Sequence, residues 1–416
     1  MSDKCDVLVI GAGPAGLFAA GVMCGDKSFK ITVAEKNNSP GKKLLITGKG
    51  RCNLTNDSDI SDFFDNIVNN REFLYSSFYG YTNTQLMEFF ESSGVPLKVE
   101  RGNRVFPVSD KSIDILKALR KYSANADFRY NAPATGLIVE NGHIKGAEFG
   151  ETVIYAKRVL LATGGLSYPK TGSTGDGFKM AKQVGHRITK LKPALVPLIT
   201  YEDTKALEGL SLKNVGVSLF GENGKKLYED FGEMLFTSNG VSGPVILSMS
   251  SFVPDGKPSY IEIDLKPALS AEKTGTRIIK DFEKYSNKNF SNSLDDLLPK
   301  KMIPVMVKAS GIAPDKKVNQ ITAAERKKLV ECLKKFRMDI KCKGSINDAI
   351  VTDGGIDVSG INPSTMESKI IKGLYFAGEI IDVHGYTGGY NLQIAFSTGH
   401  LAGVSILESL KSEVRL

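Results

Sequence analysis

The sequence predicts an α/β protein built on a doubly wound parallel sheet, interrupted by an insert of two parts. The first observation is an apolar strand, a glycine turn and a helix in direct succession over residues 7–23. The second is a pair of further apolar strands, at residues 158–162 and 373–377, each followed at once by glycines. The third is the content of 42 glycines in 416 residues without a collagen period, which is typical of tight turns and close ligand contacts.

The N-terminal segment has the length of a membrane span but the pattern of a folded unit. The 19 residues between Asp6 and Asp26 carry no charge, close to the length needed to cross a bilayer. Five glycines and Pro14 interrupt this stretch, which favours a buried strand at residues 7–10, a turn, and a helix starting at Leu17. We therefore expect no contact with a membrane.

The rest of the chain divides into one domain and an insert. A β-rich run at residues 30–34 continues the doubly wound pattern, and helical spacing is predicted over Ala323–Phe336. Short alternating strands and then lysine-rich helices fill the middle of the chain. The predicted organisation is a dinucleotide-binding domain at residues 1–190 and 346–416, a β-rich insert at 191–266 and a basic helical insert at 267–345.

Cysteine usage indicates a reducing compartment, and we expect the cytoplasm. The chain has five cysteines, an odd number, without a C-x-x-C or other short metal or redox spacing. This argues against a disulfide framework and a metal site. The N-terminus also lacks the basic region and cleavage site of a secretory signal.

The turn at residues 11–16, GAGPAG, fits the dinucleotide pattern G-x-G-x-x-G after a strand and before a helix. Gly11 permits the tight turn, Gly13 admits a pyrophosphate, and Gly16 allows close packing of helix and strand. Glu35, 19 residues after Gly16, is placed to accept hydrogen bonds from ribose hydroxyls. This pattern alone leaves open the choice between a flavin and a nicotinamide dinucleotide.

Glycine motifs late in the chain favour the flavin, because a bound flavin needs contacts from both ends of the chain. The runs ATGG at 162–165 and FAGE at 376–379 each end a strand, and Glu379 is a natural partner for ribitol hydroxyls. The run GYTGGYN at 385–391 leads into a helix whose N-terminus can stabilise negative charge on a reduced flavin ring. The alternative is a glycine-rich loop without a cofactor role.

These motifs, with several others, carry a family resemblance over nearly the whole chain. The additional runs are GKKLLITGKGRCNLTN at 41–56, RVFP at 104–107, TGSTGDG at 171–177 and FTSNGVSGP at 236–244. The chain resembles the BaiN/YhiN-like NAD(P)/FAD-dependent oxidoreductases, also described as aminoacetone oxidase-like flavoproteins. Lys49 departs from the family pattern, which usually has glycine there.

The resemblance implies a Rossmann-like domain that binds FAD without a covalent bond, with a β-barrel-like and a helical insert. It further implies reduction of conjugated C=C bonds, as in a steroid enone or a uridine of large-subunit ribosomal RNA. Substrate does not transfer with the fold. The residues expected to contact FAD are Gly11, Gly13, Pro14, Ala15, Gly16, Glu35, Lys36, Lys43, Gly50, Arg51, Cys52, Thr163, Gly164, Gly165, Asp176, Gly378, Glu379, Gly388, Gly389, Tyr390, Asn391 and Leu392.

Three residues are candidates for the general acid. A thiol with an ordinary pKa of about 8.5 is protonated at neutral pH, so Cys52 is able to deliver the proton that follows hydride transfer. The alternative for Cys52 is a packing role, and His384 and Tyr386 are the rival acids. Arg51, beside Cys52, is expected to hold an anionic group.

No second G-x-G-x-x-G follows a strand in the sequence, so a dedicated nicotinamide domain is not expected. NAD(P)H would visit the flavin, reduce it and leave before the substrate binds.

The charge of the chain is concentrated in the helical insert. Residues 266–345 contain 19 Lys and Arg against 9 Asp and Glu, a net charge of +10, while the whole chain carries +8, so the remainder sums to −2. A basic module is typical of a polyanion binder, and a solvated lysine-rich face is the alternative. The candidate RNA contacts are Arg326, Lys327, Lys328, Lys334, Lys335 and Arg337.

The sequence thus predicts an FAD-dependent, NAD(P)H-linked reductase. Ribosomal RNA, with formation of dihydrouridine, is the favoured substrate, and a small enone of the steroid or bile-acid type is second. A flavin amine oxidase and a non-catalytic flavin protein are more distant alternatives.

Overall fold

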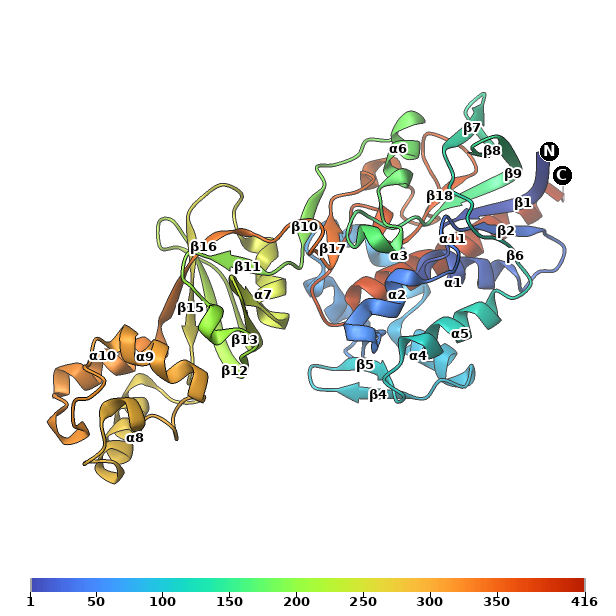
Figure 1. Cartoon of the computed structure of the whole chain (residues 1–416). Coiled ribbons are helices and arrows are strands. Elements are labelled where there is room, and N and C mark those ends of the chain that lie inside the picture. The colour runs from blue at the N-terminus through green and yellow to red at the C-terminus, as the bar shows by residue number, and fades with distance from the viewer. Residues whose placement is uncertain (1, 415–416) are drawn as a thin grey trace. The chain divides into compact units, whose positions relative to one another are not determined.

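The computed structural model describes residues 2–414, which fold as two compact units (Figure 1). The first unit runs to Ala194 and resumes at Ile346, and the second spans Leu195–Ser345. Strands β10 (Lys192–Ala194) and β17 (Val351–Asp353) pair antiparallel where the chain leaves and re-enters the first unit.

The first unit is built on a seven-stranded sheet whose parallel strands all end at one edge. The path β6-β2-β1-β9 is parallel, and the long strand β9 then pairs with two neighbours on one side. Its first half pairs antiparallel with β8, and its second half pairs parallel with β18. The strands are β1 (Ser2–Ile10), β2 (Ile31–Ala34), β6 (Asp127–Arg129), β7 (Gly136–Glu140), β8 (His143–Phe149), β9 (Thr152–Leu161) and β18 (Leu374–Phe376).

The predicted fold class is confirmed, and the four predicted strands are present. The segments around residues 7–10, 30–34, 158–162 and 373–377 form β1, β2, β9 and β18. Because parallel strands end at the same edge, the turns that follow these strands all meet there. This edge is where ligands of open α/β sheets bind.

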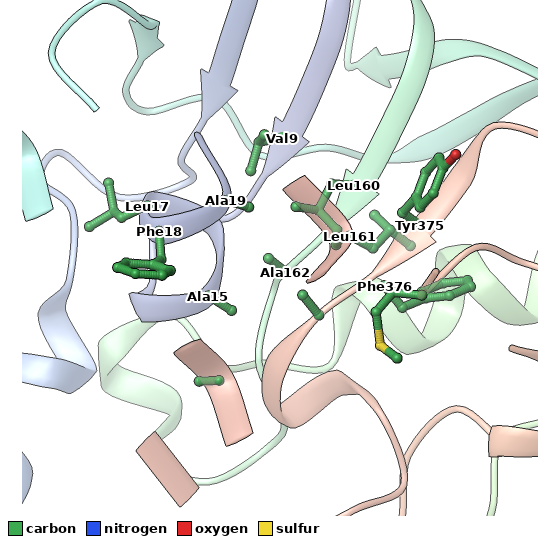
Figure 2. Packing of buried hydrophobic residues seen from close by; sticks show 14 of the residues in the cluster. Val9, Ala15, Leu17, Phe18, Ala19, Leu160, Leu161, Ala162, Tyr375 and Phe376 are labelled. Carbon is green, nitrogen blue, oxygen red and sulfur yellow. The ribbon is translucent and has the colours of Figure 1, made fainter. Parts of the chain in front are cut away.

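Two helices from opposite ends of the chain pack closely beside the sheet, α1 (Pro14–Met23) and α11 (Tyr390–Val414) (Figure 1). A Cβ atom built on Gly399 would lie 2.6 Å from the Ala15 carbonyl oxygen, and one on Gly403 would lie 3.0 Å from that of Ala19. Glycine is therefore needed at this contact. Figure 2 shows buried side chains of β1, β9 and β18 beside those of α1, including Phe18.

Smaller elements complete the first unit. A three-stranded antiparallel sheet with the order β3-β5-β4 follows the loop at residues 47–54. Its strands are β3 (Thr55–Asn56), β4 (Leu97–Glu100) and β5 (Arg104–Pro107). The remaining helices are α2 (Lys42–Ile46), α3 (Tyr75–Gly80), α4 (Asn83–Ser92), α5 (Ser112–Tyr122) and α6 (Asp176–Gln183).

The second unit is a closed six-stranded antiparallel barrel with helices. Side chains alternate along its strands: in β15, Ile261 and Ile263 are fully buried, whereas Tyr260 and Glu262 are half-buried on the other face. The strands are β11 (Leu198–Thr200), β12 (Ser211–Gly221), β13 (Lys226–Thr237), β14 (Gly240–Ser242), β15 (Ser259–Asp264) and β16 (Phe336–Lys343). The helices are α7 (Pro244–Met249), α8 (Ala271–Lys284), α9 (Ile303–Ser310) and α10 (Ala323–Lys334).

The prediction that residues 267–345 form a helical insert, with a helix reaching Phe336, is wrong at its C-terminal end. Helix α10 ends at Lys334, and residues 336–343 form the barrel strand β16. The reason is a change of period, because Phe336, Met338 and Ile340 alternate with polar residues, as a half-buried strand requires. Helices α8, α9 and α10 are therefore inserted between β15 and β16, the last two strands of the barrel, whereas α7 precedes β15.

Two further findings concern the described residues. Within residues 2–414, no helix combines the length and apolar character needed to cross a membrane. In the same part of the chain, no group of three or more His, Cys, Asp or Glu side chains is arranged to hold a metal ion.

Candidate active site

The glycine turn after β1 contains two glycines that the packing requires and one that faces open space. Gly11 has a φ of +108°, and its Cβ would lie 2.4 Å from the Ala162 carbonyl oxygen. A Cβ on Gly16 would lie 2.0 Å from the Gly11 carbonyl oxygen. A Cβ on Gly13 would meet no atom within 4 Å, and Gly13 caps the N-terminus of α1. The open space at a helix N-terminus fits a diphosphate.

A cavity extends from this turn along the ends of β2 and β9. Glu35, at the end of β2, is buried and accepts hydrogen bonds from the backbone N–H of Ala12 at 2.9 Å and of Asn37 at 2.8 Å. Thr163 lines the cavity, and its buried hydroxyl has no hydrogen-bond partner within the described residues. This oxygen is inaccessible to solvent, and a Cβ built on Gly177 would lie 2.0 Å from it, so the hydroxyl faces Gly177 and not the open space of the cavity. These residues fit the adenosine diphosphate part of FAD.

An ion pair stands at the rim of the same cavity. Lys36 Nζ lies 2.6 Å from Asp176 Oδ2 and donates a hydrogen bond to Thr174 Oγ1. Burial raises the pKa of Asp176, but hydrogen bonds from Lys36 and Thr174 outweigh it and hold the pKa below its ordinary value. Asp176 is therefore a carboxylate at neutral pH.

A second ion pair lies behind the end of β18. Lys43 Nζ is 2.5 Å from Glu379 Oε2, and each side chain is 20% exposed. Glu379 Oε1 accepts hydrogen bonds from Ser167 Oγ at 2.9 Å and from the Thr352 backbone N–H at 3.0 Å. Burial raises the pKa of Glu379, but the charge and hydrogen bond of Lys43 outweigh it and lower the pKa. The carboxylate is thus engaged by the protein, and its contact with ribitol hydroxyls stays a prediction.

The loop before α11 holds two glycines in conformations that favour glycine. Gly388 and Gly389 have φ values of +130° and +106°, and a Cβ on Gly389 would lie 2.2 Å from the Thr55 carbonyl oxygen. The Asn391 side chain accepts a hydrogen bond from the Gly385 N–H at 2.9 Å and donates one to the Gly385 carbonyl at 2.8 Å. Asn391 therefore shapes the loop, and the N-terminus of α11 follows it.

The environment of Cys52 differs from the expected one. The residue is fully buried with a φ of +63°. Burial raises the pKa of its thiol to about 12, so the expectation of an ordinary thiol pKa is wrong. This environment favours the packing role over the acid role.

His384 and Tyr386 lie on the loop that leads to α11. The His384 ring is buried, and its two nitrogens have no hydrogen-bond partner within residues 2–414; Asp353 Oδ1 is 3.5 Å from Nδ1. Burial lowers the pKa of His384, and Asp353 opposes this effect, so the imidazole is neutral at neutral pH. Tyr386 is half-buried, and burial raises the pKa of its hydroxyl, which keeps its proton.

Arg51 does not present a free positive charge. Its guanidinium forms ion pairs with Glu100 and with Asp110 Oδ1, the latter at 2.7 Å, and its Cζ lies 4.2 Å from the centre of the Phe106 ring. The expectation that Arg51 holds an anionic group is therefore corrected: two carboxylates already match its charge. Arg51 fixes the loop that contains Gly50 (φ +84°) to the small antiparallel sheet.

The six candidate RNA contacts differ in exposure and in their partners within the protein. Lys334 pairs with Asp264 at 2.5 Å and donates to the Leu269 carbonyl at 2.6 Å, so it closes the end of α10 and is not available to RNA. Arg326 is half-buried and donates to the Ile321 carbonyl. The exposed members on or just after α10 are Lys327, Lys328 and Lys335, while Arg337 lies on β16.

Sequence reasoning missed the polar residues that support the second ion pair and the histidine. Ser167 follows the ATGG motif by two residues, and Thr352 and Asp353 stand directly before a glycine pair at 354–355. That glycine pair after a short β-rich run was a usable signal. Thr163, which the sequence did identify, is brought to the same cavity as Glu35, Lys36 and Asp176.

Comparison with protein families decides the classification. The family model described as "HI0933-like protein Rossmann domain" matches residues 5–405. The chain belongs to this HI0933-like family. The resemblance drawn from the motifs is therefore confirmed, and the protein is an FAD-dependent oxidoreductase with a Rossmann-type domain.

This HI0933-like protein matches several curated relatives over nearly the whole length of both chains. It is 30% identical over 423 residues to a 3-dehydro-bile acid delta(4,6)-reductase of Clostridium scindens, covering 96% of this chain and 98% of the relative. It is 30% identical over 410 residues to a ribosomal RNA dihydrouridine synthase of Haemophilus influenzae, covering 98% and 99%. The synthase of the same name from Escherichia coli is 28% identical, covering 99% and 100%.

Solved structures share the fold at low identity. A quinol–fumarate reductase with menaquinol molecules has a TM-score of 0.54 at 17% identity, covering 99% of this chain and 72% of that one. A 3-ketosteroid delta1-dehydrogenase of Sterolibacterium denitrificans has a TM-score of 0.50 at 13% identity, covering 98% and 100%. These similarities show the fold.

Proposed function

We propose that this HI0933-like protein reduces a conjugated C=C bond with NAD(P)H as reductant, and that the bond belongs to a uridine of large-subunit ribosomal RNA. The observation that carries the dinucleotide site is the cavity beside the turn after β1, which we call the dinucleotide cradle: Gly13 faces open space at the N-terminus of α1, and Glu35 lines the same cavity. The two kinds of curated relative support the bond type, because both names describe the addition of hydrogen to a C=C bond.

The residues of the cradle would hold FAD without a covalent bond. FAD, when bound, supplies a carrier that takes hydride from NAD(P)H and passes it to the substrate. Gly13 and the α1 N-terminus would hold the diphosphate, and Glu35, fixed by the Ala12 and Asn37 N–H groups, would face the ribose. Residues 2–414 contain one turn of this kind, so NAD(P)H would bind transiently at the same flavin.

Reduction of a C=C bond consumes one proton in addition to the hydride, and we assign its delivery to Tyr386. Of the three candidates, Tyr386 alone is partly exposed, and its raised pKa keeps the hydroxyl protonated. Cys52 is fully buried, and His384 is a neutral imidazole. Both remain alternatives that a substitution series distinguishes.

The preference for RNA rests on charge. Residues 266–345 carry a net charge of +10, against −2 for the rest of the chain. A small enone does not require such a basic module, whereas RNA binding is driven by neutralisation of phosphates. The bile-acid reductase of Clostridium scindens keeps the small enone as the second candidate.

The test is mass spectrometry of ribosomal RNA nucleosides from a strain that lacks the gene. We expect one dihydrouridine to disappear and to return with the wild-type gene but not with Gly13→Val. Unchanged dihydrouridine in the deletion strain would refute the RNA substrate, and turnover of a bile-acid-type enone by the purified protein would then establish the second candidate.

A further inference from the structure

The outer face of the barrel carries a stack of planar side chains across three adjacent strands. Phe220 of β12 and Tyr260 of β15 are direct cross-strand partners, with ring centres 5.1 Å apart and planes inclined by 14°. Strand β16 is the other neighbour of β15, and the guanidinium of its Arg337 lies 3.7 Å from the centre of the Tyr260 ring. Since neighbouring residues on these strands are buried in the barrel, the stack faces outward.

A groove of about 1000 Å³ lies beside this stack, and we call it the barrel groove. Tyr201 and Tyr260 line it, and its charged lining residues are Lys257, Arg337, Lys341 and Lys343 against Glu222, Asp255 and Asp339, a net charge of +1. Tyr201 is 71% exposed, and its backbone N–H donates to the Asp339 carbonyl at 3.0 Å, which places it next to β16. A tyrosine exposed to this degree contributes little to the core, so packing does not account for it.

The cations of the barrel groove are only partly neutralised. Arg337 pairs with Asp339 at 2.7 Å, and its side chain is still 55% exposed. Lys257 and Lys341 are exposed and form no ion pair within residues 2–414. The groove therefore combines aromatic and guanidinium planes with ammonium groups that remain available.

We infer that the barrel groove binds single-stranded RNA, an inference that rests on the proposed RNA substrate. Bases of a single strand stack on aromatic rings and on guanidinium planes, while lysines neutralise the phosphates. Tyr201 and the outer face of Arg337 supply two stacking positions, and Lys257 and Lys341 supply the phosphate contacts. Paired bases in a duplex are already stacked, so the groove favours unpaired nucleotides.

The test measures fluorescence anisotropy of a labelled uridine-rich single strand of about twelve nucleotides, a length suited to one such barrel. Tyr201→Ala and Arg337→Ala should each weaken binding by roughly five-fold or more. Lys257→Ala combined with Lys341→Ala should reduce the salt dependence of binding. The matched control is Phe231→Ala, because Phe231 is 52% exposed on β13 of the same barrel but does not line the groove.

Thermal unfolding of each variant checks the fold, and Tyr201→Ala is informative even if Arg337→Ala destabilises the barrel. Wild-type affinity in Tyr201→Ala and Arg337→Ala would overturn the inference. Equal affinity for a duplex of the same length would overturn it as well.

The nucleoside analysis separates this inference from the proposed function. Loss of RNA affinity in the groove variants, with dihydrouridine unchanged in the deletion strain, keeps the groove and refutes the substrate. Dihydrouridine lost in the deletion strain, with normal RNA affinity in the groove variants, keeps the substrate and refutes the groove.

Discussion

Replacing Gly13 by valine fills the open space of the cradle without disturbing the fold. Gly13 has φ −81° and ψ −176°, an extended conformation that any residue adopts, and its Cβ would meet no atom within 4 Å. The added side chain would instead occupy the position of the diphosphate at the α1 N-terminus. We expect the purified variant to be colourless, whereas the wild-type protein is yellow and releases FAD on heating.

The expected change in the free energy of unfolding differs between the FAD-free and the FAD-bound protein. Loss of a favourable helix cap lowers the free energy of unfolding of the FAD-free protein by about 1 kcal/mol. Wild-type protein in FAD at 100 times its Kd gains about 2.7 kcal/mol, which the variant would lack. Thermal unfolding with and without added FAD therefore distinguishes a lost cofactor from a damaged fold.

Two other glycines supply the controls. Gly80 also has open space around its Cβ and is exposed on α3, so Gly80→Val should keep full FAD occupancy. Gly16→Ala places a Cβ 2.0 Å from a backbone oxygen and should destabilise the FAD-free protein itself. Full FAD occupancy in Gly13→Val would show that the cradle is not where the diphosphate binds.

Three further predictions concern the ion pair, the buried thiol and the proton. Lys43→Met should lower the free energy of unfolding at neutral pH by about 2 kcal/mol, between the values for exposed and fully buried pairs, because it leaves the largely buried Glu379 carboxylate without its cation. Since the folded-state pKa of Glu379 is lowered, the stabilisation is present at neutral pH and is lost as pH falls through that pKa. Urea unfolding of the wild type and the variant at neutral and at acidic pH measures the stabilisation and its loss. An unchanged unfolding midpoint in the variant at neutral pH would contradict the pairing. Iodoacetamide should label exposed Cys342 but not Cys52 in the native protein, as peptide mass spectrometry can show, because the Cys52 pKa is raised to about 12. Tyr386→Phe should slow flavin reoxidation by substrate at least about ten-fold and leave flavin reduction by NAD(P)H intact in stopped-flow experiments; equal effects on both would exclude it as the proton donor.

The local patterns in the sequence were sufficient for the parts of the fold that depend on neighbouring residues. The glycine turn between an apolar strand and a helix is a local sequence pattern, and Gly16 meets a local steric requirement at the Gly11 carbonyl, whereas the contact that excludes a side chain at Gly11 is with distant Ala162. Strands buried on both faces appear as short apolar runs, so β1, β2, β9 and β18 were found. The hairpin of β7 and β8 was missed although Asn141-Gly142 between its strands is a strong local turn signal. Strand β3 was missed because it pairs with β5, about 50 residues away in the chain, and no local pattern indicates that pairing.

Only the tertiary structure decided which charges are paired and which thiols are buried. Arg51 was expected to hold an anion, but Glu100 and Asp110, about 50 to 60 residues away in the chain, match its charge. Lys334 and Lys335 are neighbours in the sequence, yet Asp264 binds the first and solvent surrounds the second. A pKa or a free charge depends on burial and on partners brought together by folding, and residue type and spacing do not contain that information.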